Sequence, residues 1–204
     1  MISIFFLFIG LVIGAMAGRK LLLKQNMGEA LVANTLEKLH CLHVLINNVT
    51  LPTESGTTQI DHVLITEAGV FIIETKHYTG WILGNPRDDK WTQVIYRTKN
   101  RFQNPLHQNY GHVKTVQALF KLPESAFIGV VVFTWNAEFR TDLGPNTIQL
   151  DQLLGFIEQR PEKILDERQM AYVVGRIEMK RLGRSTETDE YHVNYVRNKI
   201  SQRG

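Results

Sequence analysis

The sequence is poor in cysteine. Cys41 is the single cysteine among 204 residues, and one cysteine cannot form an internal disulfide. A secreted domain held together by disulfides is therefore excluded, and a reducing compartment is favoured. The sequence also lacks a glycine-rich phosphate loop and a recognisable Ser-His-Asp arrangement. It has neither internal repeats nor low-complexity segments, so one globular domain is expected, with 44% hydrophobic and 21% charged residues.

An excess of one charge is missing overall but present locally. The formal net charge is only +3, which by itself does not indicate nucleic-acid binding. Residues 29–75 hold six acidic residues against one basic residue, whereas residues 76–122 hold eight basic against two acidic residues. Such blocks are either solvated loops of opposite sign or, for the basic block, a surface for an anionic partner.

No charged side chain precedes Arg19, and residues 2–17 form an apolar run. A helix over residues 2–18 is about 25 Å long at ~1.5 Å per residue, slightly short of a ~30 Å hydrocarbon core. Residues 15–17 resemble a signal-peptidase site, but the positive charges follow the apolar run instead of preceding it. We therefore expect an uncleaved, single-pass anchor over residues 1–24 in the inner or plasma membrane, with the remaining chain in the cytoplasm.

Hydrophobic periodicity predicts the elements of the remaining chain. Asn104 and Pro105 mark a helix start, as N-cap and first helical residue. The expected helices cover about residues 27–39, 104–122, 150–160 and 166–182, and the expected strands cover residues 43–51, 57–66, 69–76 and 127–135. This order predicts an α/β domain over residues 25–183, with a central β-sheet flanked by helices, and a polar tail over residues 184–204.

The stretch VFIIETKH, residues 70–77, changes from apolar to charged within one strand. Alternate strand residues share a face, so Glu74 and Lys76 point the same way, and Asp61 joins them if the pleats of the two strands match. Ionisable groups on apolar strands are costly unless they are paired or bind a metal. Carboxylate and carbonyl oxygens are ligands that Mg²⁺ prefers. The pattern predicts a metal-dependent hydrolytic phosphodiesterase centre.

These residues carry a family resemblance. Ile60-Asp61, Glu74-Thr75-Lys76 and the earlier Gly28-Glu29 resemble motifs of the PD-(D/E)XK restriction-endonuclease-like superfamily. More narrowly, TQIDHVLIT, GVFIIETKHYTGWILG and NPLHQNYGHV, within about residues 27–155, resemble the nuclease-related domain. The resemblance implies a mixed-sheet, restriction-endonuclease-like fold. It also implies an endo- or exonuclease that uses Mg²⁺ or Mn²⁺, with DNA as the first choice of substrate.

The resemblance also implies roles for single residues. Asp61 and Glu74 are expected to bind the metal, with the Thr75 carbonyl as a third ligand. Lys76 is expected to be the catalytic lysine. His77 stands where the family often has Asn, so no role is assigned to it.

Further side chains are expected around this centre. Glu29 matches the accessory carboxylate of the superfamily, although a carboxylate in a first helical turn is also what the helix dipole favours. Gln108 matches the polar residue offered by the next helix, and His112, at i+4 on the same face, is placed to reach a substrate phosphate. The basic residues expected to contact backbone phosphates are Arg97, Lys99, Arg101, Lys114 and Lys121.

Two alternatives stay open. The sequence HCLH at residues 40–43 offers three possible zinc ligands, but a tetrahedral site needs wider spacing and a second cluster. His62 points away from the face of Asp61 and is expected to be a packed or bridging histidine.

The alternative function is a nucleic-acid-binding or scaffold module that keeps the fold without catalysis. Against it stands the joint retention of four residues, Asp61, Glu74, Lys76 and Gln108.

Overall fold

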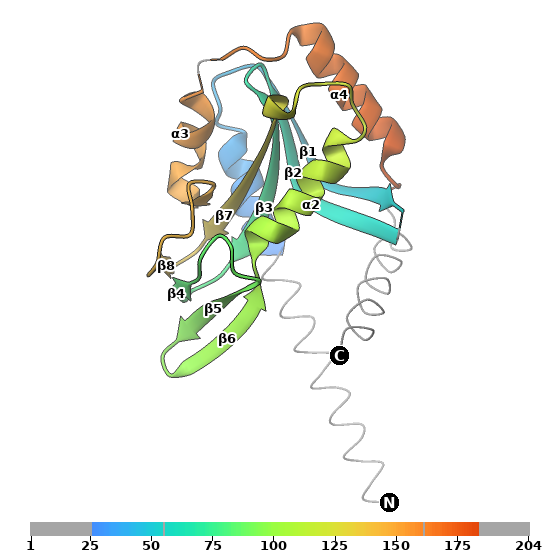
Figure 1. Ribbon diagram of the computed structural model, residues 1–204. Coiled ribbons are helices and arrows are strands. Elements are labelled where there is room, and N and C mark those ends of the chain that lie inside the picture. The colour runs from blue at the N-terminus through green and yellow to red at the C-terminus, as the bar shows by residue number, and fades with distance from the viewer. Residues whose placement is uncertain (1–25, 55, 161, 184–204) are drawn as a thin grey trace, which may run out of the picture.

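The computed structural model describes residues 26–54, 56–160 and 162–183 (Figure 1). The first helix covers residues 26–36 and ends about one turn earlier than expected. The expected anchor over residues 1–24 and most of the expected tail lie outside the described residues. Within the described ranges, no helix is both long and apolar enough to span a membrane.

The main sheet has five strands and mixed direction. Its order is β1 (His43–Thr53), β2 (Gly56–Thr66), β3 (Gly69–His77), β7 (Phe127–Thr134) and β9 (Thr147–Gln149). β1, β2 and β3 pair antiparallel, because short turns join them, whereas β7 and β9 run parallel to β3 after longer connections. The predicted central mixed sheet is confirmed.

Helices cover both faces of this sheet (Figure 1). α2 (Pro105–Gln117) and α4 (Glu167–Lys180) pack on the face that carries Ile72. The first helix and α3 (Leu153–Glu158) pack on the face that carries Phe71. Short 3-10 turns, Glu124–Ala126 and Leu150–Gln152, precede β7 and α3. The strand period of two thus divides β3 between two hydrophobic cores.

The start of α2 lies where the sequence predicts it. The Asn104 side chain accepts a hydrogen bond from the Leu106 amide at 2.9 Å, and Pro105 is the first helical residue. The same Asn104 amide group donates to the carbonyls of Pro86 and Asp88 at 3.0 and 2.7 Å. One buried side chain therefore both caps α2 and fixes the loop before β5.

A second sheet was not expected from the sequence. It has the order β6 (Thr98–Gln103), β5 (Lys90–Ile95), β4 (Gly80–Leu83) and β8 (Ala137–Phe139). Trp91 and Ile82 on its inner face pack against Phe133 at the end of β7. Gly84 permits this packing, because a Cβ there would lie 2.3 Å from Cδ1 of Trp91. The second sheet therefore extends from the end of β3, where the charged residues lie.

Candidate active site

The ladder between β2 and β3 stops at the predicted centre. Backbone pairing runs from Thr66 opposite Gly69 to His62 opposite Ile73 and goes no further. One residue on, Oδ2 of Asp61 accepts a hydrogen bond from the Thr75 amide at 2.7 Å. A carboxylate thus replaces the strand backbone as acceptor and is held beside the end of β3.

Glu74 lies between two basic side chains. Its Oε1 accepts a hydrogen bond from Nζ of Lys76 at 2.5 Å, and its Oε2 lies 3.4 Å from Nδ1 of His112. Nζ of Lys76 also donates to Oε1 of Gln108 at 3.1 Å. Gln108 and His112 are one helical turn apart on α2, so α2 supplies two of the groups around the strand residues. The expected proximity of these side chains is confirmed.

Asn109 holds α2 in this position, and the sequence reasoning missed it. The side chain is buried, and its amide group donates to the carbonyls of Ile72 at 3.0 Å and Val130 at 3.1 Å. It thereby links α2 to both β3 and β7, directly beside Gln108. A polar residue on the inward face of an amphipathic helix was the available signal.

The centre carries an excess of negative charge. Burial, followed by the charges of Glu74 and Glu29, raises the pKa of Asp61 well above its ordinary value. Burial lowers the pKa of Lys76, but the charge and hydrogen bond of Glu74, with the charge of Asp61, outweigh it and raise that pKa. Oε2 of Glu74 is buried and has no hydrogen-bond partner among the described residues. One lysine therefore does not compensate the carboxylates.

The donor set of the centre fits a hard cation. Among the described residues, no group of three or more His, Cys, Asp or Glu side chains is arranged to hold a metal. Two buried carboxylates, Asp61 and Glu74, lie together, and one Glu74 oxygen has no hydrogen bond. Oxygen donors with room for water suit Mg²⁺ or Mn²⁺. The third ligand expected from the sequence, the Thr75 carbonyl, stays a prediction.

The structure separates the remaining predicted residues. Glu29 is half-buried, and its charge reaches Asp61. Lys114 is ion-paired with Glu124 at 3.0 Å, before the start of β7. Lys76 pairs with Phe133 near the other end of β7, away from this ion pair. Lys114 therefore lies outside the centre, and its expected contact with a backbone phosphate stays a prediction.

The other basic residues lie on the second sheet. Arg97, Lys99 and Arg101 are exposed on the hairpin of β5 and β6, in a basic block where the sequence pattern predicts no strands. Lys121 is exposed beyond the C-terminal end of α2. The basic block thus divides between two regions, and the hairpin follows β4, which continues from the end of β3 (Figure 1).

Two histidines beside the centre have structural contacts. His62 is buried, and its Nδ1 lies 2.7 Å from Oδ1 of Asn47, so the expected bridging histidine is confirmed. Burial lowers the pKa of His62 to about 4. His77 lies on the opposite face from Lys76, with its Nδ1 at 2.7 Å from Oγ1 of Thr134.

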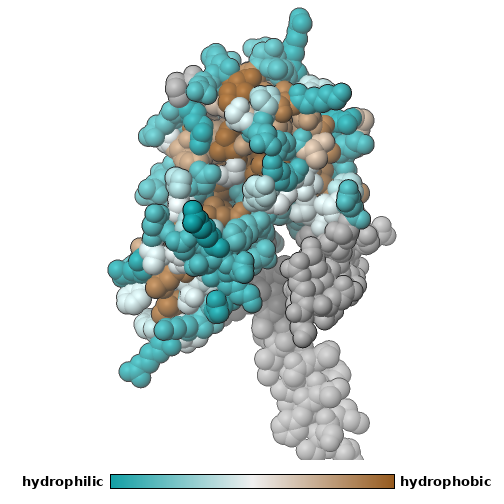
Figure 2. Space-filling view, in the orientation of Figure 1, coloured by the Kyte–Doolittle hydropathy of each residue, from teal (hydrophilic) through white to brown (hydrophobic). Residues whose placement is uncertain are grey.

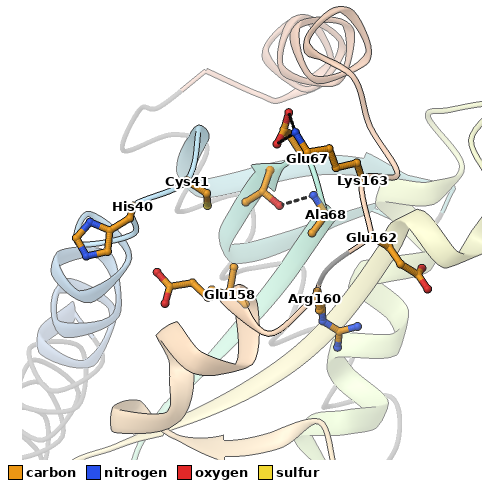
Figure 3. Close-up of a pocket in the computed structure, with 10 residues that line it drawn as sticks. His40, Cys41, Glu67, Ala68, Glu158, Arg160, Glu162 and Lys163 are labelled. Carbon is orange, nitrogen blue, oxygen red and sulfur yellow. Dashed lines mark hydrogen bonds and ion pairs between the residues drawn. The ribbon is translucent and has the colours of Figure 1, made fainter.

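The HCLH segment lies at the other end of the main sheet, near the β2–β3 turn. His40, Cys41 and Glu67 line a pocket of about 490 Å³ there (Figure 3). Its charges are mixed, since Lys163 pairs with Glu67 at 2.9 Å. His43 binds the Cys41 carbonyl instead of a shared centre. Cys41 is exposed. The contacts of these residues therefore do not support the zinc site considered from the sequence.

The chain is similar in sequence to known proteins. A family model described as the nuclease-related domain matches residues 24–134. A protein of Bacillus anthracis, described as uncharacterized, is 50% identical over 100 residues, which make up 48% of this chain and 47% of that protein. The match therefore spans about half the length of this curated relative. No solved structure matches the chain.

Proposed function

This chain belongs to the nuclease-related domain family, and from that premise we propose that it is a metal-dependent nuclease that hydrolyses phosphodiester bonds in DNA. The observation that carries the proposal is the pair of buried carboxylates, Asp61 and Glu74, with the partly buried Lys76, at the ends of two adjacent strands. Burial of two carboxylates costs free energy unless they are paired or bind a metal, and such groups cluster at functional sites. Binding of a cation that assists phosphodiester hydrolysis would account for their presence here.

The two carboxylates are the proposed metal ligands, together with the Thr75 carbonyl. The chemistry that a bound Mg²⁺ supplies is polarisation of the phosphate and a lowered pKa of water. Asp61 is held for this role by the Thr75 amide. Glu74 offers Oε2, which has no hydrogen bond among the described residues, while its Oε1 stays with Lys76.

Lys76 is the proposed contact for the reacting phosphate. An ammonium group has three hydrogens to donate, and the described residues accept two of them, through Glu74 and Gln108. The third is available for a phosphate oxygen, where it would stabilise charge that develops in the transition state. Gln108 orients the lysine, and His112 lies against Glu74 from the other side.

Arg97, Lys99 and Arg101 are the proposed phosphate contacts outside the centre. All three are exposed on the β5–β6 hairpin, where a cation can meet backbone phosphates without sequence preference. Lys114 is omitted because Glu124 already pairs with it.

We also propose that the anchor expected over residues 1–24 tethers this domain to the cytoplasmic face of the membrane. The support is the apolar run and the position of the first charges after it. Protease added outside intact cells should leave the domain undigested. Digestion of the domain from outside would contradict the proposed orientation.

Cleavage and metal binding by point variants test the centre. Lys76→Ala should slow Mg²⁺-dependent cleavage of labelled DNA by roughly 10²- to 10³-fold, the usual loss for one transition-state donor, while Mn²⁺ binding persists. Asp61→Ala and Glu74→Gln should weaken both cleavage and Mn²⁺ binding, because each removes a charged oxygen ligand. Lys114→Ala is the matched control and should cleave as the wild type does.

The same experiment distinguishes the nuclease from the alternative function. A nucleic-acid-binding or scaffold module would bind DNA but show no cleavage of single-stranded DNA, duplex DNA or RNA in Mg²⁺ or Mn²⁺. Wild-type cleavage by Lys76→Ala would show that the centre is assigned to the wrong residues.

A further inference from the structure

Two exposed aromatic residues have a backbone conformation that aromatic residues rarely adopt. In the described part of the chain, the residues other than glycine with positive φ are Asn48, Tyr96 and Trp135. Asn tolerates this conformation, but a bulky side chain there is strained. Tyr96 has φ 54° and is fully exposed, and Trp135 has φ 68° and is 58% exposed. Burial of these rings therefore does not account for the strain, and such outliers often mark functional positions.

Trp135 lies beside the proposed active site. It directly follows β7, and its ring centroid is 5.3 Å from that of His77, the residue after Lys76. His77 is itself held, because Thr134 binds its Nδ1 at 2.7 Å and a Cβ on Gly28 would lie only 2.7 Å from the His77 Cβ. The tryptophan is thus braced on one side and open to solvent on the other.

Tyr96 marks the tip of the basic hairpin. Tyr96 and Arg97 form the two-residue loop between β5 and β6, and Lys99 and Arg101 follow on β6. The hairpin projects from the rest of the molecule (Figure 1), and its surface is mainly hydrophilic with a small apolar patch (Figure 2). The exposed ring of Tyr96 is therefore on the same hairpin as these basic residues.

A third exposed ring lies between these two regions. Trp81 on β4 is 47% exposed, and the Arg140 guanidinium lies 4.4 Å from its ring centroid. β4 and β8 pair in parallel from Gly80 opposite Ala137. In this register Trp81 lies opposite Glu138, and Trp135 lies in the bend that leads into β8.

We propose that Trp135 and Tyr96 stack on unpaired bases, and that the substrate presented to the active site is single-stranded DNA. This proposal rests on the proposed nuclease function for the identity of the ligand. Aromatic rings interleaved with cations bind single strands, because each base offers a free face for stacking while the phosphates meet the cations. In a duplex the bases stack on one another, so these rings would contribute little and only the phosphate contacts would remain.

The test is binding without cleavage, by fluorescence anisotropy in EDTA with the 204-residue chain in mild detergent. The probes are a labelled oligothymidylate and a labelled blunt duplex of the same length. Trp135→Gly and Tyr96→Gly remove the rings and accept positive φ without strain. Each should weaken single-strand binding roughly 5- to 150-fold, the range for loss of one stacked base, leave duplex binding unchanged, and not lower the melting temperature.

Two further variants serve as controls. Tyr172→Ala removes a ring with similar exposure, 54%, from α4 on another part of the molecule, and should leave both affinities unchanged. Trp135→Phe keeps a ring at the same place and should restore most of the single-strand affinity. Because Tyr96 is fully exposed, its variant keeps the test decisive even if Trp135→Gly folds poorly.

The outcomes separate this proposal from the nuclease assignment. The single-strand proposal would be overturned if the wild type bound the duplex equally or more tightly. It would also be overturned if the glycine variants lost affinity for the single strand and the duplex equally. Neither result bears on cleavage, which is measured separately in Mg²⁺. Selective single-strand binding without cleavage in Mg²⁺ would support the stacking surface and refute the nuclease.

Discussion

Protonation of His62 should destabilise this protein as the pH falls from 6.5 toward 4. The imidazole is 1% exposed, its Nδ1 contacts Oδ1 of Asn47, and its Nε2 is buried without a hydrogen bond to any described residue. A second proton would have to sit on Nε2, inside the protein and without an acceptor. Burial therefore lowers the pKa of His62 from 6.5 to about 4 in the folded state.

The sign and size of the effect follow from this pKa difference. Between pH 6.5 and about 4 the unfolded chain binds a proton that the folded chain does not bind, so the free energy of unfolding falls as the pH falls. The stability is fully present above pH 6.5 and is lost as the pH approaches the folded-state pKa. At about 1.4 kcal/mol per pKa unit, the loss from this residue is about 3 kcal/mol.

Urea unfolding at a series of pH values measures this contribution. His62→Asn keeps an amide donor near the position of Nδ1 but cannot titrate, so its free energy of unfolding should be less steep in pH than that of the wild type. The difference in slope should approach ~1.4 kcal/mol per pH unit between the two pKa values. Exposed His107 provides the matched control, and His107→Asn should keep the wild-type slope. Equal slopes for the wild type and His62→Asn would refute the reasoning.

Three further predictions concern the surroundings of the proposed active site. Asn109→Ala should lower the free energy of unfolding by about 1–3 kcal/mol, because it removes the two hydrogen bonds that link α2 to the Ile72 and Val130 carbonyls; urea unfolding measures this loss, and a value near zero would contradict it. Gly28→Ala should reduce cleavage, because the added Cβ would lie 2.7 Å from the His77 Cβ and displace the helix that carries Glu29; a wild-type cleavage rate would refute this. Replacing the three cations of the hairpin, Arg97, Lys99 and Arg101, with Ala should reduce the salt slope of DNA binding by about 2–3, since each phosphate contact contributes ~0.7–0.9; an unchanged slope would move the binding surface elsewhere.

Local periodicity explains what was predictable about the centre. Because side chains alternate along a strand, Glu74 and Lys76 had to share a face, and a matching pleat had to bring Asp61 to them. Asn104 followed by Pro105 likewise defined the start of α2, and the helical repeat then set His112 on the face of Gln108. These relations depend on residues close in sequence and on two fixed periods.

The second sheet was missed because its turn lacks the usual signal. A two-residue hairpin loop normally contains Asn-Gly or a glycine, whereas here Tyr96 and Arg97 form it, with Tyr96 at φ 54°. The flanking strands carry many exposed polar residues, so they show little of the alternation that a half-buried strand shows. The pairing of β5 with β6 in the structure identifies these segments as strands, which the sequence pattern does not.

By itself the sequence determined the family, the mixed α/β class and the charged group at the end of β3, because these depend on motifs and on short-range periodicity. Tertiary structure alone decided three further points. Asn109 ties α2 to two strands, Lys114 is taken by Glu124, and Trp135 comes to rest against His77. Each of these contacts joins side chains or backbone groups from segments whose relative position no local pattern specifies. Their partners exist only once the sheet has formed and the helices have packed on it.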